Sequence, residues 1–253
     1  MGKPWLFVNW TDLHFGSEFG PHPTGDKLQR WIYGRMVAAQ KEIASTYSGF
    51  QIHNGYGGEF TDKGGLQERT LALDVMAPIH KMASNSHAVR GTGYHVGEKG
   101  DEDTDVARQL GVPTISEAHQ FRLDGKLIWH THHGPKPGIK PGSRSNSLNS
   151  AASDIYYTCL EYGEAIPDLV IYGHYHQLGV GGFPYKAKDG KIRTLQVVAS
   201  PAWKAPDRYV FQKVPLAPPA QVGVMLYVPS ASKLHALVWR VPAQYRRGKV
   251  VTK

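Results

Sequence analysis

The chain has 253 residues, of which 41% are hydrophobic and 20% are charged, a balance that is typical of a folded globular protein. Lysine and arginine exceed aspartate and glutamate by 8 (29 against 21), which favours an anionic partner such as a phosphate ester or a nucleic acid. A single cysteine, Cys159, excludes an internal disulfide. No secretory signal and no apolar stretch near 18 residues is present, so we expect a cytoplasmic protein that makes no membrane contact.

Buried strands and amphipathic helices alternate along the first two thirds of the chain. The helix after Asp26, a plausible N-cap, carries its apolar residues on one stripe, and the Asp124-Gly125 pair between two apolar runs is a tight-turn signal. Pro78 should kink the second helix or end it early. The patterns predict strands near 5–10, 50–54, 87–90, 119–123, 127–131 and 168–172, and helices near 26–44, 66–82, 103–110 and 149–163.

The pattern becomes all-β after residue 177, with alternating runs near 191–199, 221–228 and 233–241. The sheet should therefore be mixed or antiparallel in its C-terminal half. We expect one domain over residues 1–253, with a frayed basic tail at 242–253. The predicted fold class is α/β, a mixed β-sheet sandwich flanked by helices.

Residue types that commonly bind metals follow three of these predicted strands. Asp12 and His14 come after the first strand, His132 after the strand near 130, and His174 and His176 after the strand near 170. Side chains alternate with a period of two, so each Asp-x-His or His-x-His pair points to one side of an extended backbone. A carboxylate with several imidazoles suits Zn, Mn or Fe better than Ca or Mg. The sequence predicts one or two divalent cations at the edge of a sheet.

These motifs resemble those of the calcineurin-like metallophosphoesterases. Asp12-Leu13-His14-Phe15-Gly16 is similar to the first motif of that family, and Gly173-His174-Tyr175-His176 is similar to the last. The run His132-His133-Gly134-Pro135 resembles the fourth motif, and residues 90–97 look like a G-T-x-x-H-x-G variant found in phage and prophage members. The resemblance covers residues 4 to 180 and implies a four-layer αββα fold, phosphoester hydrolysis and a phage-encoded protein.

The second and third motifs depart from the family pattern. Tyr56 stands where the family has an aspartate that bridges two metals, and Thr92 stands where an asparagine binds one. A neutral hydroxyl is a poor ligand, whereas a bridging carboxylate holds two cations about 3.5–4 Å apart. Three alternatives follow: Glu59 reaches in as a substitute, Tyr56 binds as a phenolate, or the site holds fewer metals. Tyr56→Asp would strengthen the weaker of two unequal metal sites in this interpretation.

The resemblance also implies roles in catalysis and substrate binding. His95, in a glycine-rich loop, would protonate the leaving group, and Arg90 would contact the phosphate. Lys136 lies in a loop over residues 134–150 that has no acidic residue and also carries Lys140 and Arg144, which suggests further phosphate contacts.

The expected function is metal-dependent hydrolysis of a phosphodiester or phosphomonoester. The expected partner is a phosphorylated small molecule or a nucleic acid, and no stable protein partner is implied. Two alternatives remain open at this point. One is an inactive module that binds metal or phosphate, suggested by Tyr56 and Thr92. The other is a nuclease, suggested by the positive charge.

Overall fold

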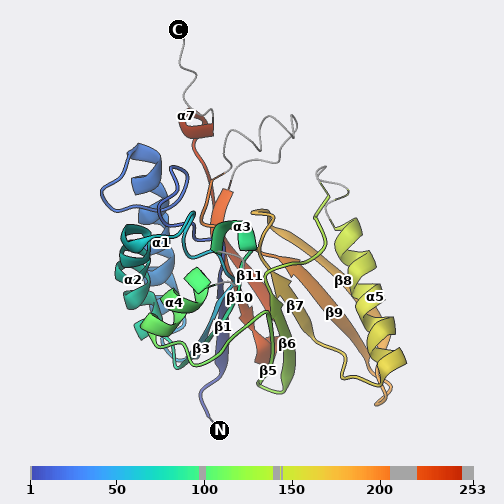
Figure 1. Cartoon of the computed structure of the whole chain (residues 1–253). Coiled ribbons are helices and arrows are strands. Elements are labelled where there is room, and N and C mark those ends of the chain that lie inside the picture. The colour runs from blue at the N-terminus through green and yellow to red at the C-terminus, as the bar shows by residue number, and fades with distance from the viewer. Residues whose placement is uncertain (1, 97–100, 139–142, 144, 206–220, 247–253) are drawn as a thin grey trace.

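Two β-sheets pack face to face between helices in a computed structural model that describes residues 2–96, 101–138, 143, 145–205 and 221–246 (Figure 1). The first sheet has the strand order β11 (Lys233–Arg240), β10 (Gln221–Val228), β1 (Trp5–Trp10), β2 (Gln51–Tyr56), β3 (Asn85–Val89) and β4 (Ile115–Ser116). The second has the order β5 (Ala118–Leu123), β6 (Lys126–Thr131), β7 (Leu169–Tyr172), β9 (Ile192–Ala199) and β8 (Gly179–Lys186).

Helices cover the outer face of each sheet (Figure 1). Those packed outside the first sheet are α1 (Lys27–Thr46), α2 (Leu66–Lys81) and α4 (Asp101–Leu110). Helix α5 (Asn146–Tyr162) lies against the second sheet, on strands β8 and β9. The short elements are α3 (Gly93–Val96), the 3₁₀ turn η2 (Pro229–Ala231) and α7 (Ala243–Arg246). No described helix is both long enough and apolar enough to cross a lipid bilayer.

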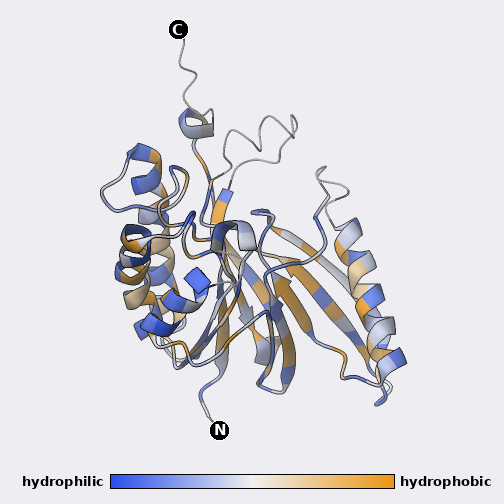
Figure 2. Ribbon diagram, viewed as in Figure 1, coloured by the Kyte–Doolittle hydropathy of each residue, from blue (hydrophilic) through white to orange (hydrophobic). Residues whose placement is uncertain are grey.

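The hydrophobic stripe of α1 explains why that helix covers the sheet. Asp26 caps the first turn through a capping box with Gln29, so the helix begins where the sequence predicts. The buried residues then recur at helical spacing: Leu28, Ile32, Met36, Ala39 and Ile43. They join the apolar layer between the helices and the first sheet, and a second apolar layer lies between the two sheets (Figure 2).

A chain of buried histidines runs through the layer between the sheets. His53 Nε2 lies 2.8 Å from His87 Nδ1, and His87 Nε2 lies 2.7 Å from His130 Nδ1. His53 also stacks on Phe121, with 4.6 Å between ring centroids. Burial lowers the pKa of His53 to about 4 and holds the pKa of His87 well below its ordinary value. These imidazoles are therefore neutral in the folded protein at pH 7.

The predicted fold class is confirmed: both sheets are mixed and helices flank them. Helix α2 continues to Lys81, so Pro78 does not end it early, and the alternative expectation of a kink stays a prediction; Val75, Met76 and Ile79 remain buried around the proline and keep the last turn in place. Strand β8 was not predicted. Residues 243–246 of the predicted frayed tail form α7, and residues 247–253 lie outside the described residues.

Candidate metal centre

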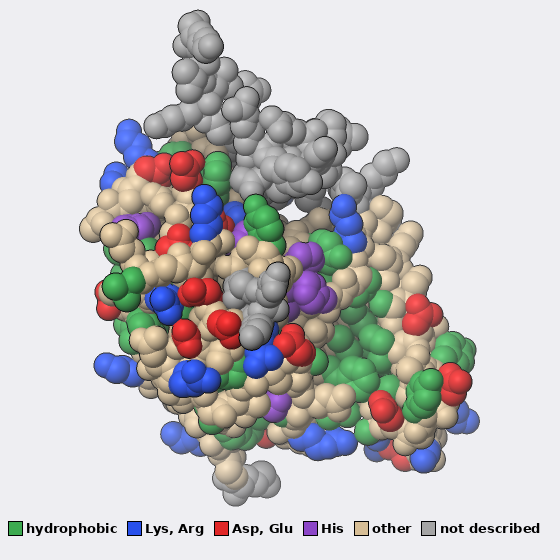
Figure 3. Space-filling view, in the orientation of Figure 1, with side chains coloured by type: hydrophobic (Ala, Val, Ile, Leu, Met, Phe, Trp, Pro, Cys, Tyr) green, Lys and Arg blue, Asp and Glu red, His purple; other side chains and the backbone are tan. Residues whose placement is uncertain are grey.

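The carboxyl ends of parallel strands from both sheets carry the candidate ligands. Strands β1, β2 and β3 are parallel neighbours in the first sheet, and β6, β7 and β9 are parallel neighbours in the second. Open α/β sheets bind ligands outside the carboxyl ends of their strands, where the following loops meet. Figure 3 shows histidine side chains gathered near the middle of one face of the molecule.

Four residues form a first group of ligand atoms. One nitrogen or oxygen from each of Asp12, His14, Glu59 and His176 lies within 4.8 Å of the others. His14 Nε2 is 2.8 Å from Glu59 Oε2, and His176 Nε2 is 3.5 Å from Asp12 Oδ1. The first three side chains are fully buried or nearly so. Two carboxylates and two imidazoles are a suitable donor set for Zn²⁺, Mn²⁺ or Fe²⁺.

Three histidines form a second group beside the first. The ligand nitrogens of His132, His133 and His174 lie within 4.8 Å of one another. His132 Nε2 is 3.2 Å from Glu59 Oε1, the carboxylate oxygen that does not face His14. The Glu59 carboxylate therefore joins the two groups, with one oxygen toward each. A carboxylate in this position can hold two cations close together against their mutual repulsion.

The hydrogen bonds of the two central histidines favour cations at these positions. His14 Nδ1 donates to the Asp62 carboxylate at 3.1 Å, and His132 Nδ1 donates to the Gly57 carbonyl oxygen at 2.6 Å. Their Nε2 atoms are buried, and each lies beside a Glu59 carboxylate oxygen, at 2.8 Å for His14 and 3.2 Å for His132. In a neutral imidazole with its proton on Nδ1, Nε2 presents a lone pair. Burial would lower the pKa of both imidazoles, but the carboxylates beside them raise it, to about 9 for His132, so a positive charge is favoured beside Glu59 and either a proton or a divalent cation can supply it.

Backbone strain is concentrated in the same residues. Asp12, His14, Glu59, His174 and His176 all have φ between +46° and +72°. They are five of the seven non-glycine residues with positive φ in the described chain. Such conformations are costly for residues with a side chain, and they cluster at functional sites, where the surroundings enforce them. The turns after β1, β2 and β7 are therefore held in unfavourable conformations that direct these side chains inward.

Asp12 is held ionised at the centre of the first group. Both of its carboxylate oxygens accept from the His174 amide at 3.0 Å, and Oδ2 accepts from the Thr11 hydroxyl at 2.7 Å. Burial alone would raise the pKa of Asp12, but His176 and His132 lower it below its ordinary value. The carboxylate is thus available as a ligand at neutral pH.

A third group surrounds Asp62, which follows β2. Its Oδ1 accepts from His14 Nδ1 at 3.1 Å and from Lys204 Nζ at 3.0 Å, and its carbonyl oxygen accepts from His95 Nδ1 at 2.7 Å. Burial would raise the pKa of Asp62, but the hydrogen bonds from His14 and Lys204 hold it well below its ordinary value. Asp62 therefore fixes the orientation of both histidines, as carboxylates and carbonyls do behind metal-binding imidazoles.

Of the residues in the three alternatives for the second motif, Glu59 lies between the two groups of ligand atoms and Tyr56 does not. The Glu59 amide donates to Asp103 Oδ2 at 2.9 Å, and this bond holds the turn that directs its side chain between His14 and His132. Tyr56 points to the opposite side of the sheet, where it is buried among the residues beneath the helices. Its hydroxyl lies 3.1 Å from His80 Nδ1, and burial raises its pKa, which disfavours a phenolate. Tyr56→Asp is therefore not expected to strengthen metal binding, contrary to the prediction from the sequence, because an aspartate there would lie in the apolar core.

The predicted substrate-binding residues, Arg90 and Lys136, make contacts with residues outside the two ligand groups. The Arg90 guanidinium donates to Glu117 Oε1 at 2.7 Å and to Thr104 Oγ1 at 3.2 Å. Lys136 is exposed, and its carbonyl accepts from the Ser147 hydroxyl. Contacts of Arg90 and Lys136 with phosphate stay predictions, and Lys140, Arg144 and Gly97 of the third motif lie outside the described residues.

Sequence reasoning missed three residues of the site: Asp62, His133 and Lys204. Asp62 lies outside the motifs that resemble the family, and His133 follows the histidine that was the candidate ligand of the fourth motif. Lys204 lies five residues beyond β9, a strand recognised for its apolar pattern alone. The sequence feature that could have identified these three residues is their place after a strand, because the carboxyl ends of β2, β6 and β9 face the site.

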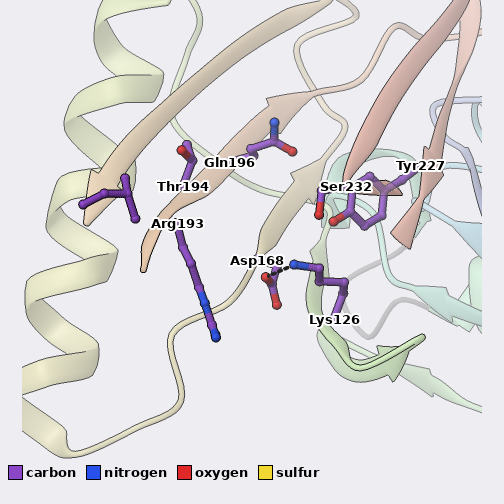
Figure 4. A pocket seen from close by; sticks show the side chains of 8 residues that line it. Lys126, Asp168, Arg193, Thr194, Gln196, Tyr227 and Ser232 are labelled. Carbon is purple, nitrogen blue, oxygen red and sulfur yellow. Dashed lines mark hydrogen bonds and ion pairs between the residues drawn. The ribbon is translucent and has the colours of Figure 1, made fainter. Parts of the chain in front are cut away.

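A cavity of about 320 Å³ lies elsewhere and contains none of these ligands (Figure 4). Lys126 Nζ and Asp168 Oδ1 close one side of it at 3.0 Å, and Asp168 Oδ2 also accepts from the Leu127 amide. These contacts fasten the start of β6 to β7. The cavity is lined by Lys126, Asp168, Ile192, Arg193, Thr194, Gln196, Tyr227 and Ser232.

No protein-family model matches the chain, and no curated protein matches it. Among solved structures, it is similar to an archaeal phosphodiesterase, with 11% identity, a TM-score of 0.46, and coverage of 92% of this chain and 99% of that one. It is also similar to the sulfate thiohydrolase SoxB of Thermus thermophilus (13% identity, TM-score 0.44, 97% and 58% covered). A third similarity is to a putative 5′-nucleotidase from Staphylococcus aureus (12% identity, TM-score 0.40, 97% and 56% covered).

Proposed function

We propose that the protein hydrolyses phosphate esters with the help of one or two divalent cations, Mn, Zn or Fe. The observation that carries the proposal is the position of Glu59, whose two carboxylate oxygens face His14 on one side and His132 on the other. The proposed ligands are Asp12, His14, Glu59, His132, His174 and His176.

Cations at this site would activate water as a nucleophile near neutral pH and neutralise charge on the phosphoryl oxygens. The residues of the chain hold that arrangement in place before substrate binds. Asp62 and the Gly57 carbonyl fix the tautomers of His14 and His132, so that both Nε2 atoms are free to bind a metal. Fixed ligands of this kind reduce the reorganisation needed as charge develops in the transition state.

His95 is the proposed general acid. Its ring lies 4.6 Å from the ring of His14, measured between centroids, and its side chain remains 20% exposed, so a substrate can reach it. Nδ1 donates to the Asp62 carbonyl at 2.7 Å, which leaves Nε2 to hold the proton that is transferred. That proton would go to the leaving-group oxygen as the bond from oxygen to phosphorus breaks.

His95→Gln is expected to slow hydrolysis of alkyl phosphate esters by about 10²–10⁴-fold, the usual contribution of a general acid. Esters of nitrophenol should be affected much less, because nitrophenolate leaves without a proton. The measurement is kcat/KM over a series of leaving groups of rising pKa. An equal loss across the whole series would contradict the assignment and would indicate a positioning role instead.

Lys204 is proposed as a positioning residue that acts through Asp62. Its side chain is 9% exposed and its Nζ lies 3.0 Å from Asp62 Oδ1. Lys204→Met retains the apolar stem and removes the charge that orients the carboxylate behind His14. We expect metal affinity to fall roughly 10- to 100-fold, as for other residues that support a ligand from behind. Metal titration of the apo-protein tests this, with exposed Lys188→Met as the control; equal affinity in both variants would contradict it.

Turnover of bis(4-nitrophenyl) phosphate with added Mn²⁺ tests the proposed function. Activity should be lost in excess chelator and return when the metal is restored. His176→Ala should abolish it, whereas Cys159→Ala, which changes a buried thiol within α5, should not. Metal binding without turnover of any phosphate ester would instead indicate a binding module.

A further inference from the structure

We propose that His133 is a metal ligand and that it supplies the donor lost at Thr92. This inference rests on the proposed metal centre and adds a residue to it. The second cation would then be held by His132, His133 and His174 together with the shared carboxylate of Glu59. Thr92 would orient that carboxylate without binding metal.

The three imidazoles are arranged around a common point. Their ring centroids are 4.9 Å apart for His132 and His133, 4.9 Å for His133 and His174, and 5.2 Å for His132 and His174. One nitrogen from each ring lies within 4.8 Å of the others. His132 is fully buried, and its Nε2 lies 3.2 Å from Glu59 Oε1. Three imidazole nitrogens gathered beside one carboxylate oxygen form a donor set that suits a divalent transition metal.

His133 reaches the site because β6 ends at Thr131. Within a strand, residues 132 and 133 would point to opposite faces of the sheet. Beyond the strand that alternation no longer holds, and the two successive rings meet at an interplanar angle of 83°. His133 is exposed, whereas His132 is buried, so His133 would close the second cation site on its open side.

Thr92 forms two hydrogen bonds with the side chain of Glu59. Its hydroxyl lies 2.5 Å from Glu59 Oε1, and its amide lies 3.2 Å from the same oxygen. Both groups donate to the carboxylate, which fixes the oxygen that faces His132. Glu59 is thus anchored by its own amide on Asp103 and by Thr92 at its carboxylate. Thr92 would therefore hold the shared carboxylate in position without itself binding a metal.

This assignment makes the two cation sites chemically different. The first would have two carboxylates and two imidazoles, from Asp12, Glu59, His14 and His176. The second would have three imidazoles and one carboxylate oxygen, the donor set typical of zinc sites in which three histidines bind the metal. Zinc should therefore favour the second site, and manganese, which prefers oxygen ligands, should favour the first.

Calorimetric titration of Zn²⁺ into the apo-protein tests the inference, with Co²⁺ absorption as a second readout. Wild type should bind two ions per chain. His133→Ala should weaken one step by 100-fold or more, retain the other, and lose part of the visible Co²⁺ bands. Thr92→Val should weaken both steps, because it loosens the shared carboxylate. His22→Ala, in a loop before α1, is the matched control, and circular dichroism checks that each variant is folded.

Two binding steps of wild-type affinity in His133→Ala would overturn the role of His133 and leave the proposed function intact. Loss of both ions in a folded His133→Ala would also overturn it, because the residue is assigned to one site alone. Failure of wild type to bind any transition metal would instead refute the proposed function. The two failures are therefore distinguishable in one titration series.

Discussion

Glu59→Gln is expected to lower kcat/KM for a phosphodiester by roughly 10³-fold, because in the proposed centre the shared carboxylate would hold two cations together. Glutamine has nearly the same shape as glutamate but no charge. Its single oxygen could still accept from Thr92, but its amide nitrogen could not bind the other cation. The change removes one negative charge between His14 and His132, which lie 2.8 and 3.2 Å from the carboxylate oxygens. The second ion should be lost first.

Steady-state kinetics with metal analysis of the same samples measures both effects. Glu164→Gln is the matched control, since Glu164 is an exposed carboxylate after α5, and this variant should retain activity and metal. Tyr56→Phe should likewise retain activity, because the Tyr56 hydroxyl faces His80 on the opposite side of the sheet. Wild-type turnover in Glu59→Gln would show that the carboxylate is not part of the site.

The free energy of unfolding should fall more steeply with decreasing pH in the wild-type protein than in a variant that lacks one buried histidine. His53 and His87 have pKa values below the ordinary value in the folded state, to about 4 for His53, so they stay neutral while the unfolded chain takes up protons below about pH 6.5. Stability contributed by these groups is therefore present above pH 6.5 and is lost as the pH falls toward 4. For His53 the total loss is on the order of 3 kcal/mol.

His53→Phe should remove this part of the pH dependence, because a phenyl ring can occupy the same place against Phe121 without a proton to bind. At pH 7.5 the variant should be less stable by about 1–3 kcal/mol, since His87 Nδ1 loses its partner. Urea unfolding of both proteins in chelator at pH 7.5, 6.5 and 5.5 measures the two slopes. Parallel slopes would contradict the assignment of a neutral His53.

Elements with a strong periodic pattern could be predicted from the sequence. Helix α1 begins after Asp26 as its capping residues indicate, and the β5–β6 hairpin forms around Asp124 and Gly125. Strand β8 could not be recognised, because it contains Gly179, Gly181, Gly182 and Pro184, residues that are uncommon within strands. It forms because β9 pairs with it along its whole length and α5 packs on it. These contacts depend on segments distant in the sequence.

The positions of the candidate ligands on spaced motifs could also be predicted, since Asp12, His14 and His176 lie in one group and His132 and His174 in the other; their role as ligands stays a prediction. The direction of Glu59 could not, because it depends on a left-handed backbone conformation held by Asp103, 44 residues away. The contact of Lys204 could not be predicted for a similar reason, because its partner Asp62 is 142 residues away in the chain. Pattern reasoning locates residues on elements, whereas hydrogen bonds between loops decide which side chains meet.

The number of divalent cations per chain, measured together with turnover in the same sample, tests the central claim most directly. The protein should contain up to two transition-metal ions, lose them to chelator with all phosphodiesterase activity, and regain both when Mn²⁺ or Zn²⁺ is restored. An active protein that contains no metal by mass analysis, or full activity in excess chelator, would contradict the proposed centre around Glu59.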